Sequence, residues 1–589
     1  MTKNLLFISL FAIALSSCNN KKTDVSAAAT STIPDSSFQG LSEEFLTGYL
    51  AARPAYAVAL GFHEYDGKIS DYSKAAIDSE LLRLKSYDQK LSSLDTSGLS
   101  TKMFYDYRIL QSGIRNEIFY IEDVGSFSKN PMTYAGAIDV NIYIKRDFEP
   151  IEERVRSIIN IEKGAAKTFA AARANLDDSL AKPFIETAIQ IAEGSAQFLS
   201  GDLVIALKDV KNDSLVAEFN RTNKMAIAEV KAFADYLKKE KMPKAHNHYQ
   251  LGTEKYKKML LYGENITLSP DEILAIGMRE LKKEQELFNA AAKIIDPAKK
   301  PVKVYDETQM EHPTADSLIP GARMNIEAIR QFVVDKKITT MPSDVRVIIT
   351  ETPQYARATS TASMDIPGPF EKKATEAYYY ITPVDPKWTP QQKEDWLKSF
   401  NYYTTDIVSI HEAYPGHYTQ FLHLNASSAT KIEKIFGSYA YIEGWAHYTE
   451  KMMIDEGFGN NGDPIKAAKY RIAQSGDALL RLCRLCVSIK THTQGMTVDE
   501  ATKFFMDNWY QGDKPSRQEA IRGTFDPGYL YYTLGKLQIL KLREDYQKQE
   551  GSNFSLQKFH DALMDNGMPS IRLIREILLK DKNLWNQVL

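Results

Sequence analysis

The segment 411–417, His-Glu-Ala-Tyr-Pro-Gly-His, constrains this chain most, because it places two imidazoles and a carboxylate within seven residues. A second carboxylate, Glu443, follows 26 residues after His417. A hydrolytic zinc ion needs neutral imidazoles, a carboxylate and one open position for water. The stretch therefore predicts a metallohydrolase site, and the fold must bring these groups together.

The spacing of the two histidines is unsuited to one regular helix. On such a helix His417 would lie about 240° around the axis and about 9 Å along it from His411. Two imidazoles so placed cannot both bond one ion at about 2.1 Å. Pro415 lacks an N–H group and Gly416 reaches dihedral angles closed to other residues, so these two residues can break or bulge the helix. We expect such a break to bring His417 beside His411.

An alternative interpretation needs no metal. His411 can end one helix and His417 can begin the next, with Pro-Gly as an ordinary turn between them. The clustering of potential ligands favours the metal site, because four of the ten histidines and two glutamates fall within a short stretch. The four histidines are His411, His417, His423 and His447.

The chain resembles a known family at four motifs, which occur in the family's order. Three are His-Glu-Ala-Tyr-Pro-Gly-His at 411–417, Glu-Gly-Trp-Ala at 443–446 and His-Thr-Gln-Gly-Met-Thr at 492–497. The fourth is Pro-Gly-Tyr-Leu-Tyr-Tyr-Thr-Leu-Gly at 527–535. Together they resemble the bacterial domain of unknown function 885 family, over most of the chain after about residue 38. Many relatives carry another histidine where this chain has Tyr418.

That resemblance implies a largely helical, gluzincin-like zinc metallopeptidase with one zinc ion. It implies that His411, His417 and Glu443 are the metal ligands. Glu412 is implied to be the general base that takes a proton from metal-bound water, and a base must lie within hydrogen-bond reach of that water. Glu443 can instead be a solvated helix carboxylate, but its apolar and aromatic neighbours would make an unpaired charge costly.

Three further residues are candidates to orient the ligands. His447 lies four positions after Glu443, on the same face of a regular helix. We expect it to support a ligand, with direct coordination as the alternative. Gln420 and Glu450 are predicted to orient ligands as well, although both residue types are equally common on a surface.

Two residues are candidates to stabilise the oxyanion that forms when water attacks an amide carbonyl. Tyr532 matches the tyrosine of the family's last motif, and its alternative role is aromatic core packing. His492, in the third motif, is a second candidate donor. Arg522 and Arg543 can bind a substrate carboxylate, although surface ion pairs are a common use of arginine.

The N-terminus predicts export and lipid anchoring. Residues 1–18 have a charged start, an apolar run and small residues before Cys18, as in a bacterial lipoprotein signal. The apolar run, residues 5–15, is too short to span a bilayer. Residues 19–37 are polar and predict a flexible tether. We therefore expect a cell-envelope protein that is held outside the cytoplasm by a lipid on Cys18.

The fold class predicted is mainly α, with a small β-sheet beside the active-site helices. Apolar residues recur at helical spacing over 151–175, 214–241 and 271–295. Residues 345–350 and 377–382 are β-rich, and we expect the second run to be an edge strand that can align an extended peptide. Residues 38–589 are predicted to form one large catalytic region, with a helical part over 38–300 and the metal site in 301–589.

Composition narrows the function further. A net charge of −3 argues against a nucleic-acid surface. Cys483 and Cys486 lie in a helix-like run, so we expect two packed thiols and no redox pair. The prediction is a zinc-dependent hydrolase of peptide or amide bonds in the cell envelope. The alternative is a lipoprotein that binds peptides or metal without turnover, and the sequence leaves open the cleavage position and the oligomeric state.

Overall fold

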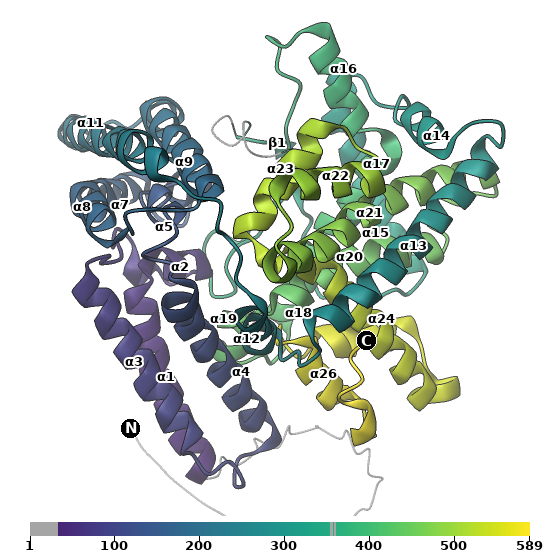
Figure 1. Ribbon diagram of the computed structural model, residues 1–589, viewed down its shortest axis with the longest axis horizontal. Coiled ribbons are helices and arrows are strands. Elements are labelled where there is room, and N and C mark those ends of the chain that lie inside the picture. The colour runs from purple at the N-terminus through teal and green to yellow at the C-terminus, as the bar shows by residue number, and fades with distance from the viewer. Residues whose placement is uncertain (1–32, 354–356, 358–360) are drawn as a thin grey trace, which may run out of the picture.

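The computed structural model describes residues 33–353, 357 and 361–589, and the protein is mainly helical (Figure 1). Cys18 and the signal segment lie outside these residues. Helix α1 begins at Ile33, so residues 33–37, which the sequence assigned to the tether, are helical. Among the described residues no helix combines the length and apolarity needed to cross a bilayer.

The first eleven helices form two layers with separate apolar cores, on the left in Figure 1. One layer holds α1 Ile33–Ala52, α2 Pro54–Leu60, α3 Lys74–Ser92 and α4 Thr101–Ile118. The other holds α5 Met132–Ala135, α6 Ile142–Lys145, α7 Ile151–Lys163, α8 Ala165–Asn175, α9 Lys182–Ser200, α10 Asp202–Ala206 and α11 Asp213–Tyr236. The helix predicted over 151–175 is therefore two helices, divided at Gly164.

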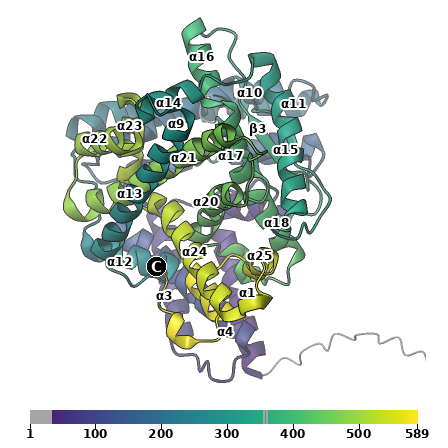
Figure 2. The same ribbon diagram turned by 90° about the vertical axis from the view of Figure 1, so that its right-hand side faces the viewer.

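The remaining helices surround the candidate site. They are α12 Thr253–Glu264, α13 Pro270–Ile295, α14 Pro301–Thr308, α15 Leu318–Asp335, α16 Pro390–Ser399, α17 Tyr402–Glu412, α18 His417–Ala426, α19 Lys431–Ile435, α20 Tyr439–Asp455, α21 Pro464–Gln494, α22 Val498–Trp509, α23 Asp513–Phe525, α24 Tyr531–Glu550, α25 Leu556–Met564 and α26 Ile571–Leu578. Helix α13 packs along α21 (Figures 1 and 2). The predicted parts 38–300 and 301–589 therefore share a packed interface, and α12 contacts both α4 of the first layer and α21.

The expected small sheet is present, but one strand has a different place in it. Strands β1 Ile348–Glu351, β2 Ala362–Asp365 and β3 Tyr378–Ile381 lie in the order β1-β3-β2. Strand β3 is parallel to β1 and antiparallel to β2, so it is central and the predicted edge role of 377–382 is wrong. The edge strand on one side is β2, which the sequence did not predict because its Ala-Ser-Met-Asp run has little β-propensity. The Tyr379 hydroxyl of β3 lies 3.2 Å from Ser409 Oγ, which joins the sheet to α17.

Helix α20, which carries Glu443, is fixed at its start by a buried carboxylate from α12. Glu264 Oε1 accepts the Ala440 N–H at 2.9 Å, and Oε2 accepts the Ser438 hydroxyl. A carboxylate at a helix N-terminus satisfies amide groups that have no partner within the helix. Burial raises the pKa of Glu264 to about 7 against the lowering effect of these hydrogen bonds.

We predict that Glu264 makes the protein less stable as pH rises. The pKa in the folded state exceeds the usual glutamate value of 4.5, so the folded state holds a proton between pH 4.5 and about 7 that the unfolded state has lost. Over that window the free energy of unfolding falls by up to roughly 3 kcal/mol from this group. The E264Q variant should therefore show a smaller loss of stability between pH 5 and 8 than the wild type, measured by thermal unfolding.

The matched control is E254Q, at an exposed position of the same helix. That variant should keep the wild-type dependence on pH. An undiminished pH dependence in E264Q would show that Glu264 is not a buried titrating group.

Candidate metal centre

The seven-residue motif is divided between two helices. Helix α17 ends at Glu412 and α18 begins at His417, with Pro415 and Gly416 in the turn. The Gly416 N–H donates to Ile410 O at 3.0 Å, which folds the turn back onto the end of α17. A Cβ atom on Gly416 would lie 1.8 Å from His411 O, so only glycine fits here. The break expected from Pro-Gly is therefore confirmed.

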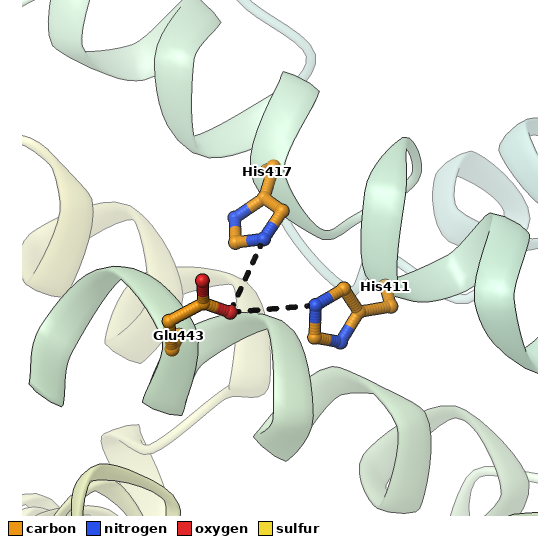
Figure 3. Close-up of side chains that lie close together, drawn as sticks. All are labelled: His411, His417 and Glu443. Carbon is orange, nitrogen blue, oxygen red and sulfur yellow. Dashed lines mark ion pairs between the residues drawn. The ribbon is translucent and has the colours of Figure 1, made fainter. Parts of the chain in front are cut away.

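The two histidine side chains and Glu443 converge across this turn (Figure 3). Glu443 Oε2 lies 3.5 Å from His411 Nε2 and 3.6 Å from His417 Nε2. Ligand atoms bonded at about 2.1 Å to one tetrahedral ion are about 3.4 Å apart, so the observed spacing suits a shared ion. The backbone matches the alternative of a helix end and a helix start, yet the imidazoles still meet.

One buried oxygen of this group has no hydrogen-bond donor among the described residues, and a cation would compensate its charge. Glu443 Oε2 is buried and accepts no hydrogen bond within the described residues. His411, His417 and Glu443 together form the group of potential metal ligands found in the described part of the chain, with ligand atoms within 4.8 Å of one another. A buried carboxylate oxygen without a donor is costly unless a positive charge compensates it. The residues present therefore fit a zinc ion.

Glu450 binds His411 through the ring nitrogen Nδ1, which does not face Glu443. Its Oε1 lies 2.7 Å from His411 Nδ1, and its Oε2 lies 2.9 Å from His447 Nδ1. A hydrogen bond at Nδ1 leaves Nε2 of His411 free to face Glu443, the usual arrangement for a ligand imidazole. His447 is thus bonded to Glu450, and its Nε2 lies 3.4 Å from Lys536 Nζ. The structure places His447 behind the ligands, as expected.

The charges of this cluster explain its pKa shifts. Burial lowers the pKa of His411, but Glu443 and Glu450 outweigh burial and raise it to about 10. Burial raises the pKa of Glu443, but the two histidines hold it well below its usual value. Burial, with the Lys536 ammonium, depresses the pKa of His447, which stays neutral and can accept from Lys536. Positive charge at the imidazoles thus compensates the carboxylates here, a role that a cation would take over.

Glu412 stands beside His411 and reaches the edge strand. Its Oε2 accepts the Met364 N–H at 3.1 Å, and its side chain is half-buried. This hydrogen bond fixes the carboxylate near the ligand group without placing it in the ligand triangle. Met364 was missed in the sequence, since nothing near it in the chain indicates the contact.

Tyr532 reaches the site because α20 and α24 approach closely. A Cβ on Gly535 would lie 1.8 Å from Ala440 O, so the two helices cross at glycine. Burial raises the pKa of Tyr532, as does the Glu443 charge, while Arg484 is the largest opposing cation. The phenol therefore lies within electrostatic reach of the metal ligands.

His492 lies outside the site, which corrects its predicted role as a donor to the oxyanion. Its Nε2 lies 2.8 Å from Gly523 O, and its Nδ1 accepts the Leu251 N–H at 3.4 Å. Both ring nitrogens are thus committed to backbone groups, and burial lowers the pKa of His492 to about 4. The residue lies about 16 Å along α21 from Arg481, the residue of that helix that pairs with Glu450. The family motif therefore marks a structural histidine.

The structure also shows the surroundings of Gln420 and of the two cysteines on α21. Gln420 is buried beside the Tyr441 phenol, and within the described residues no hydrogen bond joins its side chain to the three ligands. Cys483 and Cys486 are buried free thiols on α21, as expected. Arg481 and Lys536 were missed, although each interrupts an apolar helical run, and a charge there is a signal for a buried partner.

Known proteins resemble this chain in sequence and in fold. The model of a family described as bacterial protein of unknown function (DUF885) matches residues 54–578. The chain belongs to this family. No curated protein matches it.

Two solved structures are similar to this member of the DUF885 family. A candidate lipoprotein of unknown function from Shewanella oneidensis is 25% identical, with a TM-score of 0.77, over 92% of this chain and 100% of that chain. A candidate lipoprotein from Colwellia psychrerythraea is 16% identical, with a TM-score of 0.75, over 94% of this chain and 99% of that chain. The second likeness shows the shared fold.

We predict that the G416A variant loses the metal centre. The added Cβ cannot stay 1.8 Å from His411 O, so the turn must move and His417 with it. Overpacking of this kind should lower stability by at least about 2 kcal/mol. Zinc content and the melting temperature of the purified variant measure both effects. In the control variant, G512A, the Cβ meets no atom within 4 Å and should change neither; a G416A protein with full zinc content would contradict the account of the turn.

Proposed function

We propose that this DUF885 protein is a zinc-dependent hydrolase of peptide or amide bonds. The observation that carries the proposal is the buried Glu443 Oε2, which has no hydrogen-bond donor among the described residues and lies 3.5 and 3.6 Å from two imidazole nitrogens. His411, His417 and Glu443 would hold the ion. When bound, zinc supplies a Lewis acid that lowers the pKa of water and polarises a carbonyl.

The protein's own groups supply the proton transfers. Glu412, adjacent to His411 and held by the Met364 N–H, would take a proton from the attacking water and pass it to the leaving amine. Tyr532, whose pKa is raised and whose hydroxyl stays protonated at neutral pH, can donate to the developing oxyanion. Glu450 keeps the His411 ring oriented through Nδ1.

The edge strand β2 offers a place for an extended peptide. The Thr382 N–H donates to Thr361 O, and Ser363 is opposite Tyr380. In an antiparallel ladder the alternate residues Ala362 and Met364 then direct their main-chain groups away from β3. Since Met364 already contacts Glu412, a peptide added to this edge would lie along the catalytic carboxylate.

Cell-envelope anchoring through Cys18 belongs to the same proposal. The sequence Leu-Ser-Ser-Cys at 15–18 follows an apolar run, and the Shewanella oneidensis relative is described as a candidate lipoprotein. A lipid on Cys18 would place the site outside the cytoplasm, where a hydrolase meets peptides of the envelope.

We predict that E412Q abolishes hydrolysis and spares zinc. Glutamine keeps the size of the side chain but cannot take a proton, so kcat should fall by at least about a hundredfold. Cleavage of a peptide library and zinc content measured on the same protein separate the two effects. The control E327Q removes a carboxylate that pairs with Arg346 at the surface and should change neither. Full activity in E412Q would defeat the proposed mechanism, and zinc without any cleavage in the wild type would favour a metal-binding lipoprotein.

We also predict one zinc ion per chain, held by the three ligands. Replacement of Glu443 by Gln, or of His411 by Ala, removes one ligand and should reduce bound zinc by tenfold or more at a fixed free zinc concentration. Elemental analysis of dialysed protein gives the stoichiometry, and H248Q, at an exposed histidine, is the control. Retention of one zinc ion in both variants would place the ion elsewhere.

A further inference from the structure

Arg481 and Arg484 lie against the Tyr532 ring, and Arg522 lies over the Tyr529 ring, three residues earlier in the chain. The Cζ atoms of Arg481 and Arg484, on α21, lie 5.7 and 5.3 Å from the centre of the Tyr532 ring. Arg522, at the end of α23, also acts electrostatically on the Tyr532 phenol. Glu443 acts on the same phenol, so the arginines and the metal ligands share Tyr532 as a neighbour. We call Arg481, Arg484 and Arg522 the arginine cluster.

The cluster has hydrogen-bond donors to spare. Arg484 binds Glu519 through Nε and Nη2 at 2.7 and 2.8 Å. Arg522 binds Asp526 through the same two nitrogens at 3.0 and 2.9 Å. Within the described residues no hydrogen bond uses Nη1 of either arginine. Each guanidinium is therefore held by one acidic residue and keeps one edge free.

Arg481 shows that a partner is lacking. Its Nη2 lies 3.2 Å from Glu450 Oε1 and its Nη1 lies 3.3 Å from Asp477 Oδ2, whereas its Nε is buried and has no hydrogen-bond partner in the part of the chain that the structure describes. The residue is only 9% exposed, so water does not freely satisfy this donor. A buried cationic donor without an acceptor is costly, so an acceptor that belongs to a ligand would relieve it.

The cluster is open to solvent on one side. The Arg522 side chain is 34% exposed and Tyr532 is half-buried, while Arg481 and Arg484 lie deeper. Arg543, by comparison, donates to the Tyr448 hydroxyl at 3.1 Å and lies 3.6 Å from Glu456, without a phenol beside the candidate ligands. Free guanidinium edges that face a phenol near metal ligands are instead suited to an anion that enters from solvent.

The geometry points to a substrate subsite: the arginine cluster binds a carboxylate of the substrate while the scissile bond lies at the metal ligands. This inference rests on the proposed hydrolase and narrows its substrates to peptides or amides that carry a carboxylate close to the cleaved bond. The carboxylate can be the free C-terminus or an acidic side chain. Arg522 is the specificity-determining residue that is open to test, because it is the most exposed member.

The experiment compares three forms of one mixed-sequence peptide library on zinc-loaded protein. The first form has a free C-terminal carboxylate, the second is amidated, and the third is amidated with a glutamate next to the varied bond. The wild type should cleave the first or the third form with kcat/KM roughly ten to a hundred times that for the second, the effect of one charged hydrogen-bonded pair. Whichever form is preferred identifies the source of the carboxylate.

Variants assign the preference to the cluster. R522Q should lose most of the preference through a higher KM for the form that carries the carboxylate, with the zinc content unchanged, and R522K should retain part of it. The control R543Q removes a partly exposed arginine that lies about 16 Å along α24 from Tyr532. This variant should keep the full preference. Equal cleavage of all three forms by the wild type, or a full preference in R522Q, overturns the inference and leaves the hydrolase proposal intact.

A binding measurement decides the case in which no peptide is cleaved and the hydrolase proposal fails. Calorimetry then compares succinamate, which has one carboxylate and one amide, with the neutral diamide succinamide on the zinc-loaded wild type and on R522Q. Tighter binding of succinamate by at least tenfold in the wild type, lost in R522Q, supports the arginine cluster as a carboxylate site. Equal affinity for the two probes overturns it.

Discussion

The structure around the site depends on one buried carboxylate. Glu443 lies on α20 with an oxygen that no donor of the described residues reaches, between two imidazoles that come from different helices. Removing a carboxylate from water is expensive, and only positive charge close by makes it tolerable. The α17–α18 turn, the cap that Glu264 gives to α20, and the crossing of α20 with α24 all serve to bring that charge and that oxygen together.

Behind the ligands, charges alternate in a connected chain. Glu450 joins His411 to His447 and pairs with Arg481, and His447 in turn meets Lys536. Every member is buried, so each charge or dipole needs the next one. Such a network fixes the His411 ring more firmly than a single hydrogen bond would. It also connects the ligands to the arginine cluster, because Arg481 belongs to both.

The sequence motifs differed in what they revealed. The motif at 411–417 predicted the helix break that brings the two imidazoles together, because a six-residue spacing cannot serve one ion on a regular helix. The motif at 492–497 was equally visible, yet His492 binds the backbone of Gly523 and Leu251. The sequence cannot distinguish a histidine that binds a metal from one that packs in the core, because the difference depends on which residues surround it in the folded protein. The edge strand β2 was not predicted for a similar reason, because it forms through pairing with β3 and through the contact with Glu412.

By itself the sequence determined the helical class, the small sheet and the family, and it predicted which residues converge at the candidate metal centre, because these depend on local periodicity, turn chemistry and spacing. Tertiary structure alone decided that α13 packs along α21, that Met364 holds Glu412, and that Arg481 and Arg484 lie over the Tyr532 ring. Those contacts join residues from tens to well over a hundred positions apart in the chain. Their energies come from burial and charge pairing across helices, which no local pattern encodes.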